Sequence, residues 1–215
     1  MLTITRFQFN MFGENTYLLV DSATSEAAVV DPGMFYPEEY KAFDDYISGH
    51  HVQLKQIINT HLHLDHCFGA DYVKTKYGAP VSAHEADAPL GANIPDQSRR
   101  FGIREEQQAV GIDVKLHDGD TVAIGSGSLR VLHVPGHSPG GIALYCAAQH
   151  FVLVGDSLFQ GSVGRTDLPG GDHSTLVASI RARLLTLPPD TTVLPGHGDP
   201  TTIEAELRSN PFLRQ

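Results

Sequence analysis

Apolar residues in the first sixty positions follow the two-residue alternation of β-strands, with one helical stretch between them. The alternation and the turn-forming residues around it predict short strands at 3–9, 17–20 and 27–30. Tyr40, Phe43 and Ile47 then recur at helical spacing, and an apolar strand follows at 55–59. This order predicts a β-α-β unit at the start of the chain.

The rest of the chain is richer in strands. The pattern is helical from Phe68 to Tyr77 and again from Leu176 to Leu187, and it has no clear period from 88 to 111. We expect the 88–111 segment to be a loop with at most a short helix. Further strands are predicted at 81–84, 114–116, 121–124, 129–134, 142–146, 151–154 and 191–194.

Two helix starts carry capping signals. Asp172 or Ser174 precedes the 176–187 helix, and the Thr201 to Glu204 segment matches a capping box that opens a final short helix. Both halves of the chain thus run through strands, helix and strand, with histidine-bearing loops after the strands. We therefore expect an α/β fold of two mixed sheets packed face to face, with helices on the outside, in a single domain, 1–215.

Composition excludes several classes of protein. The formal net charge of -10 makes nucleic acid a poor partner, because proteins that bind nucleic acid concentrate Lys and Arg. No stretch is long and apolar enough for a membrane helix, and residues 1–6 lack the regions of a signal peptide. We expect a cytoplasmic protein that binds neither membranes nor nucleic acid, whose cysteines, Cys67 and Cys146, are buried thiols.

The densest chemistry lies in Thr60-His61-Leu62-His63-Leu64-Asp65-His66, directly after a predicted strand. Residues two apart in an extended segment share a face, so His61, His63 and Asp65 can point into one cavity, and a turn can bring His66 beside them. Imidazole and carboxylate groups suit divalent zinc, iron or manganese. A carboxylate among the histidines favours two adjacent ions over a closed structural zinc site.

Three more candidate ligands stand where an apolar strand passes into a loop. Each follows a glycine that lets the backbone approach closely: Gly136-His137, Gly155-Asp156 and Gly196-His197. Taken singly, a His beside Gly and Pro is usually a turn residue, and an Asp after a strand is usually a cap or a turn former. The repetition at three strand ends makes these residues ligand candidates.

The other histidines are expected to be solvated or structural. Four lie in loops, in turns or before a helix: His50, His51, His117 and His173. Three sit on or beside strands: His84, His133 and His150. Cys67 follows His66 directly, and we expect it to be a small packed residue rather than a catalytic one.

In this order the His-x-His-x-Asp-His segment, the lone His, the Gly-Asp and the Gly-His resemble the metallo-β-lactamase superfamily, and Val30-Asp31-Pro32-Gly33 extends the resemblance to the start of the chain. The resemblance implies a four-layer αβ/βα sandwich. It implies that one metal is held by His61, His63 and His137, that a second is held by Asp65, His66 and His197, and that Asp156 bridges both. Asp31 would orient a ligand imidazole, with a plain strand-ending turn as the alternative.

Such a site implies a hydrolase with two divalent ions per chain, zinc first and iron or manganese as alternatives. A water that bridges two ions loses its proton near neutral pH, since one zinc already lowers its pKa to about 7. The hydroxide would be the nucleophile, and Asp65 would orient it or carry its proton. A thiolate leaves without a strong acid, so a small-molecule thioester is the expected substrate.

The segment from Gly155 to Asp172, with Gly164-Arg165-Thr166-Asp167 at its centre, resembles the short glyoxalase II-like branch, hydroxyacylglutathione hydrolases without the C-terminal helical domain. The resemblance implies a glutathione thioester such as S-lactoylglutathione. Arg165 would then pair with the glycyl carboxylate of glutathione, and a salt bridge to Asp167 that shapes the loop is the alternative.

Other branches of the superfamily match fewer residues. Secreted β-lactamases differ at the position of Asp156, and flavodiiron proteins place Glu where His63 stands. A glutathione persulfide dioxygenase with a single iron shares the Gly-Arg-Thr-Asp loop but typically has Cys where Ser162 or Val163 stands. It stays an alternative, as does a lactonase of the same fold, because the same hydroxide attacks a cyclic ester.

Overall fold

The first of two six-stranded sheets is built from the N-terminal half of the chain. The computed structural model describes residues 1–214. The sheet has the order β1-β2-β3-β4-β5-β6, antiparallel from β1 to β3 and parallel from β3 to β6. Its strands are β1 Leu2–Phe9, β2 Glu14–Asp21, β3 Glu26–Val30, β4 Gln53–Ile58, β5 Val81–His84 and β6 Val114–Leu116.

The second sheet comes from the C-terminal half and has the order β14-β13-β10-β9-β8-β7. Only the β10 and β13 pair is parallel within this sheet as described over residues 1–214. Its strands are β7 Thr121–Ile124, β8 Gly127–His133, β9 Ile142–Cys146, β10 Phe151–Gly155, β13 Thr192–Pro195 and β14 Thr201–Thr202. A separate small hairpin pairs β11 Leu158–Phe159 with β12 Ser162–Val163.

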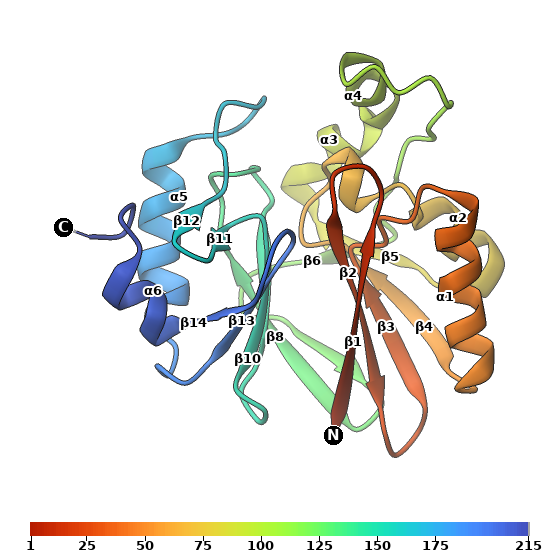
Figure 1. Ribbon diagram of the computed structural model, residues 1–215, viewed down its shortest axis with the longest axis horizontal. Coiled ribbons are helices and arrows are strands. Elements are labelled where there is room, and N and C mark those ends of the chain that lie inside the picture. Colours follow the sequence, from red (N-terminus) through yellow and green to blue (C-terminus); the bar gives the residue numbers. More distant parts are fainter. Residues whose placement is uncertain (215) are drawn as a thin grey trace.

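Helices cover the outer faces of both sheets and give four layers (Figure 1). On the first sheet lie α1 Pro37–Gly49 and α2 Ala70–Tyr77. On the second lie α5 His173–Ser179, the π-helical segment η3 Ile180–Leu184 and α6 Ile203–Ser209. Near the turn between β1 and β2 lie the 3-10 segments η1 Leu64–His66 and η2 Glu85–Asp87 with the short helices α3 Ala88–Ala92 and α4 Ile94–Arg100.

Strand alternation decides which layer each apolar residue joins. Leu18 packs in a cluster with Phe43 of α1, whereas its neighbour Leu19 packs between the two sheets with Leu144 of β9. Leu176 of α5 belongs to a third cluster, on the outer face of the second sheet. Because both halves share the cluster between the sheets, we infer a single domain. Gln215, the last residue of the expected 1–215 domain, lies outside the described residues.

The predicted fold class is confirmed, and several predicted element bounds need correction. The 88–111 segment is more helical than predicted, because α3 and α4 each have a proline as their second residue, which presets the helical φ while breaking the apolar period. The final helix is capped by Thr202, whose Oγ1 accepts a hydrogen bond from Ala205 N at 3.2 Å, and Thr201 belongs to β14. The helix expected to reach Leu187 ends with η3 at Leu184, and the β11–β12 hairpin was missed.

Two expectations from composition can be checked against the fold. Within residues 1–214, no helix has the length and apolar character needed to cross a membrane. Cys67 and Cys146 are buried free thiols, as predicted. Burial raises the pKa of the Cys67 thiol well above its usual range, so the thiol stays protonated and is a poor nucleophile.

Gly136 fixes the path of the chain into the His137 loop, and replacing it should be costly. Its φ is +128°, and an added Cβ would lie 2.3 Å from the backbone N of Leu176 in α5. We expect Gly136→Ala to lower the free energy of unfolding by about 2–5 kcal/mol, because the alanine would strain the backbone and overlap with the backbone of α5. Urea unfolding followed by circular dichroism measures the loss.

Gly119→Ala is the matched control for Gly136→Ala. Gly119 also has a positive φ, +88°, but an added Cβ there would meet nothing within 4 Å. It should lose only the backbone contribution of about 1–2 kcal/mol. Equal losses in the two variants would show that the contact with α5 does not matter.

Candidate metal centre

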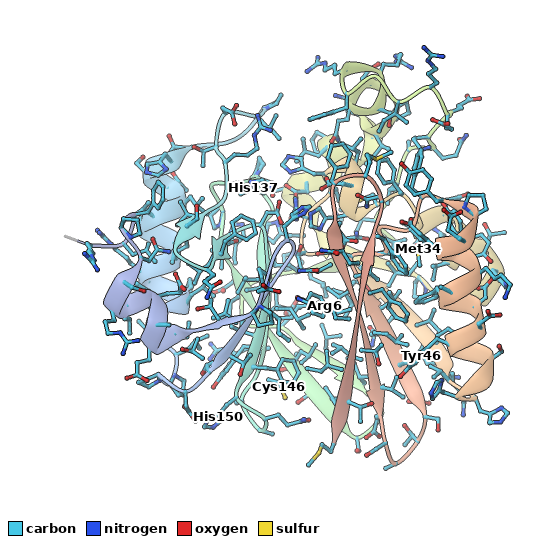
Figure 2. The ribbon with its side chains drawn as sticks, viewed as in Figure 1. Arg6, Met34, Tyr46, His137, Cys146 and His150 are labelled. Atoms are coloured by element: carbon cyan, nitrogen blue, oxygen red, sulfur yellow. The ribbon has the colours of Figure 1, made fainter. Side chains whose placement is uncertain are left out.

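The seven candidate ligands meet at one end of the sandwich, where strands give way to loops. His61 and His63 come shortly after β4, and Asp65 and His66 belong to η1. From the second sheet, three ligands follow β8, β10 and β13, respectively: His137, Asp156 and His197. Figure 2 shows His137 at this end, between the two sheets. Ends of strands from both halves are therefore needed to assemble the site.

The first group consists of His61, His63 and His137, all buried. His137 Nε2 lies 2.9 Å from His63 Nδ1 and 3.2 Å from His61 Nε2. Two of the three remaining ring nitrogens have fixed partners: His61 Nδ1 lies 3.0 Å from Thr60 Oγ1, and His137 Nδ1 lies 2.8 Å from the Arg165 carbonyl oxygen. The third, His63 Nε2, is buried without a hydrogen-bond partner within residues 1–214. A Nδ1–H that donates to each oxygen leaves the Nε2 lone pair pointing into the group.

The second group consists of Asp65, His66 and His197. Asp65 Oδ2 lies 3.1 Å from His197 Nε2 and 3.6 Å from His66 Nε2. The other ring nitrogen of His66 lies 3.2 Å from Asp31 Oδ2. Both groups thus have imidazoles whose outward nitrogen is held by an oxygen of the protein.

Asp156 stands between the two groups. Its Oδ1 lies 3.4 Å from His66 Nε2, and its Oδ2 lies 3.5 Å from His197 Nε2 and 3.7 Å from His137 Nε2. One carboxylate therefore reaches both sets of nitrogens, as a bridging ligand must.

Asp31 could be mistaken for a ligand, because it also lies close to His61 and His66. Its two oxygens are already engaged: Oδ1 accepts the Thr60 N–H at 2.7 Å, and Oδ2 accepts the Thr60 hydroxyl at 2.6 Å. Asp31 thereby orients His66 directly and His61 through Thr60. Its backbone has a φ of +51°, an uncommon conformation for a non-glycine residue.

The two groups fit divalent ions. Nitrogen and oxygen ligands that share one ion at 2.0–2.1 Å in a tetrahedron lie about 3.3 Å apart. The atom pairs given above lie 2.9–3.7 Å apart, and all ligand atoms of a group lie within 4.8 Å of one another. Within residues 1–214, the buried atoms His66 Nε2 and Asp156 Oδ1 have no hydrogen-bond partner. Such atoms are costly to bury unless something else binds them.

The electrostatics of the two groups differ. Burial lowers the pKa of His61 well below its usual range and that of His63 to about 3, helped by the neighbouring imidazoles, so both are neutral ligands. Burial also disfavours protonated His66, but Asp156 and Asp65 outweigh it and raise the pKa of His66. Ion binding to the second group must therefore displace a proton from His66.

A comparison with known families decides what this assembly is. A family model described as the metallo-beta-lactamase superfamily matches residues 10–197. The chain belongs to this superfamily. The resemblance found in the sequence is confirmed, and the chain is a metal-dependent hydrolase of this superfamily.

Individual members of the superfamily are similar along their whole length. The hydroxyacylglutathione hydrolase GloC of Haemophilus influenzae is 36% identical over 99% of this chain and 96% of its own. A structure titled BLEG-1 B3 metallo-beta-lactamase is 34% identical, with a TM-score of 0.90 over 99% of this chain and 100% of that chain. TTHA1623, solved in a di-iron-bound form, is 36% identical, with a TM-score of 0.86 over 97% and 100% of the two chains.

The structure adds a buried carboxyl that the sequence had placed in a turn. Glu14 is fully buried at the start of β2, and its Oε1 lies 3.9 Å from His66 Nδ1. Burial raises the pKa of Glu14 well above its usual range. Gly33 in the Asp-Pro-Gly motif makes room for it, since a Cβ there would lie 2.1 Å from Glu14 Oε2. Only the need for a glycine at 33 hinted at such a neighbour.

Asp87 is a second residue that sequence reasoning missed. Its buried carboxylate accepts hydrogen bonds from Leu62 N at 3.2 Å, Ser138 Oγ at 2.8 Å and Gly140 N at 2.6 Å. Leu62 lies between two ligands of the first group, and Ser138 follows the third. Asp87 therefore ties the His61–His63 segment to the His137 loop. Nothing in the apolar pattern around 87 marks it, because η2 is a single short turn.

A cavity of about 400 Å³ opens onto both groups. Its lining is largely apolar and includes Phe12, Leu90, Phe101, Phe159 and Leu168. Arg165, the predicted substrate-binding residue, also lines it. The guanidinium of Arg165 binds Asp167 through Nε and Nη2 at 2.7 and 2.8 Å, so the alternative salt bridge is present as well.

Removing the Asp87 carboxylate should weaken the metal centre without touching a ligand. Asp87→Ala leaves two backbone N–H groups and a hydroxyl unpaired in a buried site, which should lower the free energy of unfolding by about 2–4 kcal/mol. The ligand loops lose their shared anchor, so metal affinity should fall about 10- to 100-fold. Metal retained during dialysis against a chelator measures this effect.

Asp190→Ala serves as the control for Asp87→Ala. Asp190 is exposed and pairs with His150, so its loss should change stability by no more than about 0.5 kcal/mol. Retention of metal by Asp87→Ala at the affinity of the unmodified chain would show that the loops hold their geometry without this carboxylate.

Proposed function

We propose that this chain is a binuclear thioesterase that hydrolyses small-molecule thioesters, with glutathione thioesters of the S-lactoylglutathione type as its first candidate substrates. The observation that carries the proposal is the pairing of two ligand groups, joined by Asp156, with a single cavity that is lined mainly by apolar side chains. The similarity to GloC, a hydroxyacylglutathione hydrolase, supports the same substrate class.

The proposed ligand assignment follows the geometry. His61, His63 and His137 hold one ion, Asp65, His66 and His197 hold the other, and Asp156 contacts both. Zinc is the first expectation, with iron or manganese as alternatives, and the di-iron form of TTHA1623 supports iron as one of them. When bound, two such ions supply Lewis acidity toward the thioester carbonyl and lower the pKa of the attacking water.

Asp65 is proposed as the residue that handles the proton of the attacking water. It lines the cavity and accepts a hydrogen bond at Oδ2 within the second group. Burial raises the pKa of its carboxyl, but His66 and His197 outweigh burial and lower it, so the group is ionised and able to accept a proton.

The leaving group distinguishes a thioester from an amide. Among the described residues that line the cavity, every carboxyl or imidazole is one of the seven candidate ligands, and the remaining charged side chains are Arg100 and Arg165, which do not give up protons. A thiolate can leave unprotonated, since thiol pKa values are about 8.5. An amine must be protonated as it leaves, so this lining favours thioesters.

Arg165 remains a proposed substrate-binding residue. Its Nη1 is the guanidinium nitrogen that the Asp167 pair leaves unused within residues 1–214, and it can donate to a substrate carboxylate. The carbonyl oxygen of Arg165 has a separate role, because it orients His137.

Asp156→Ala tests the ligand assignment. Loss of the carboxylate that contacts both groups should reduce the metal content below two ions per chain and lower activity by at least about 100-fold. Metal analysis of the purified protein and steady-state kinetics at saturating metal give the two readouts.

His133→Ala is the histidine control for Asp156→Ala. His133 stacks on His84 at a centroid distance of 4.2 Å and lies outside both groups. It should retain two ions per chain and nearly full activity. Equal effects of the two substitutions, or a single iron in the unmodified chain, would contradict the assignment; the latter would favour the dioxygenase.

Thiol release from S-lactoylglutathione tests the substrate class. Protein loaded with zinc, iron or manganese should release glutathione, with a kcat/KM at least about 100-fold above that for a β-lactam, because no separate acid is placed to protonate an amine. The β-lactam is the control substrate that the BLEG-1 relative suggests. Absence of thiol release with every metal, combined with lactone opening or oxygen consumption with glutathione persulfide, would replace the proposed substrate.

A further inference from the structure

Three loops form the mouth of the cavity. The turn between β1 and β2 contributes Phe12, the end of α4 contributes Arg100 with Phe101 after it, and the loop before α5 contributes the 165–169 segment. Figure 1 shows these three segments at the same end of the molecule. They border the cavity that opens onto the ligand groups.

Phe12 and Phe101 form an apolar edge to this mouth. Their rings pack edge to face, with centroids 5.7 Å apart and planes at 87°. The two side chains remain 37% and 43% exposed, unusually high for large aromatic residues. Because they join the β1–β2 turn to α4, they offer one continuous apolar surface beside the cavity.

The three arginines around this mouth have different environments. Arg165 is paired with Asp167, and Arg99 is paired with Asp96 on the outside of α4. Arg100 is exposed, lines the cavity and has no ion-pair or hydrogen-bond partner for its guanidinium within residues 1–214. Its whole guanidinium is therefore available to a ligand, whereas Arg165 can offer only the Nη1 that its pair with Asp167 leaves unused.

The negative net charge of the chain makes a cation beside the cavity important for an anionic substrate. With a formal net charge of -10, the protein repels an anionic substrate at long range. The ligand groups also carry the carboxylates Asp65 and Asp156 into the cavity. A free guanidinium at the entrance provides local attraction, and its planar fork matches a carboxylate.

We propose that Phe12, Arg100 and Phe101 form a substrate-binding rim that selects thioesters carrying a carboxylate. The aromatic pair packs against the chain of the substrate, and Arg100 pairs with its carboxylate while the thioester carbonyl faces the two ligand groups. This inference rests on the proposed thioesterase function and adds a specificity determinant to it. The carboxylate can lie on the thiol half or on the acyl half of the substrate.

Matched acids and esters separate these two sources. One pair is S-acetyl-mercaptopropionate and its methyl ester, with the carboxylate on the thiol half. The other is the succinyl thioester of N-acetylcysteamine and its methyl ester, with the carboxylate on the acyl half. The ratio of kcat/KM for acid over ester is measured for the metal-loaded protein and for the variants Arg100→Gln and Arg99→Gln.

For the pair whose carboxylate reaches the rim, Arg100→Gln should lower the acid-to-ester ratio about tenfold, chiefly through KM. Arg99→Gln, one residue away but paired with Asp96, should keep the ratio of the unmodified chain. Whichever pair shows the loss identifies the half that carries the carboxylate. An unchanged ratio for both pairs in Arg100→Gln overturns the inference.

Binding of thioether analogues, in which a methylene replaces the thioester carbonyl, tests the rim independently of hydrolysis. It therefore separates a failure of the rim from a failure of the proposed thioesterase function. Calorimetric titration should show about a tenfold loss of affinity for the acid analogue, relative to its ester, in Arg100→Gln. If the unmodified chain hydrolyses neither these four thioesters nor S-lactoylglutathione, the proposed function fails. This binding ratio then decides the rim alone: a loss supports it and no loss overturns it.

The aromatic pair has its own test. Phe12→Ala should raise KM for acids and esters alike by about fivefold, because it removes apolar contact rather than charge. Met11→Ala is the matched control, since Met11 is 45% exposed in the same turn and does not line the cavity. Unchanged KM values in Phe12→Ala would remove the aromatic pair from the rim.

Discussion

The structure depends on one constraint: five imidazoles and one carboxylate of the two groups, together with Asp156 as a second carboxylate, must lie side by side, most of them buried, at the edge where the two sheets meet. Without a partner, each polar atom there loses water and gains nothing in return. The chain meets this requirement in part by fixing the outward ring nitrogen of three of the five imidazoles. Asp31 holds His66 and, through Thr60, His61, and the Arg165 carbonyl holds His137.

The same constraint ties the two halves of the fold together. Ligands of each group come from both sheets, so neither group exists until the sheets have packed. Asn15 at the start of β2 donates from its side chain to the carbonyl oxygens of Pro195 and Gly198, and Tyr17 donates its hydroxyl to Pro195. These bonds join the first sheet to the His197 loop. Ion binding must therefore stabilise the packing of the sheets as well as the loops.

The sequence predicted the site best where metal-binding residue types directly follow a strand with clear apolar alternation. The His61 to His66 segment and the Gly-His137, Gly-Asp156 and Gly-His197 pairs stand at strand ends, and strand alternation placed those ends correctly. The residues that were missed act only through tertiary contact. Glu14 sits in a turn-like sequence and reaches His66 across the fold, and Asp87 bonds to Leu62, Ser138 and Gly140, which lie at 25 to 53 positions from it. No local pattern contains such distances.

The least periodic segment of the sequence turns out to line the cavity. The prolines in the first turns of α3 and α4 obscure the helical pattern from 88 to 100. These helices nevertheless supply Leu90, Gln97 and Arg100 to the lining of the cavity. Gln97 has a structural role, because its side chain forms hydrogen bonds with the backbone of Leu64 and Leu90. The candidate ligands thus come from segments that follow strands, while short, weakly patterned helices supply part of the cavity lining. Chemistry in this chain is set by strand ends, and selectivity must be set by the loops and short helices that face them.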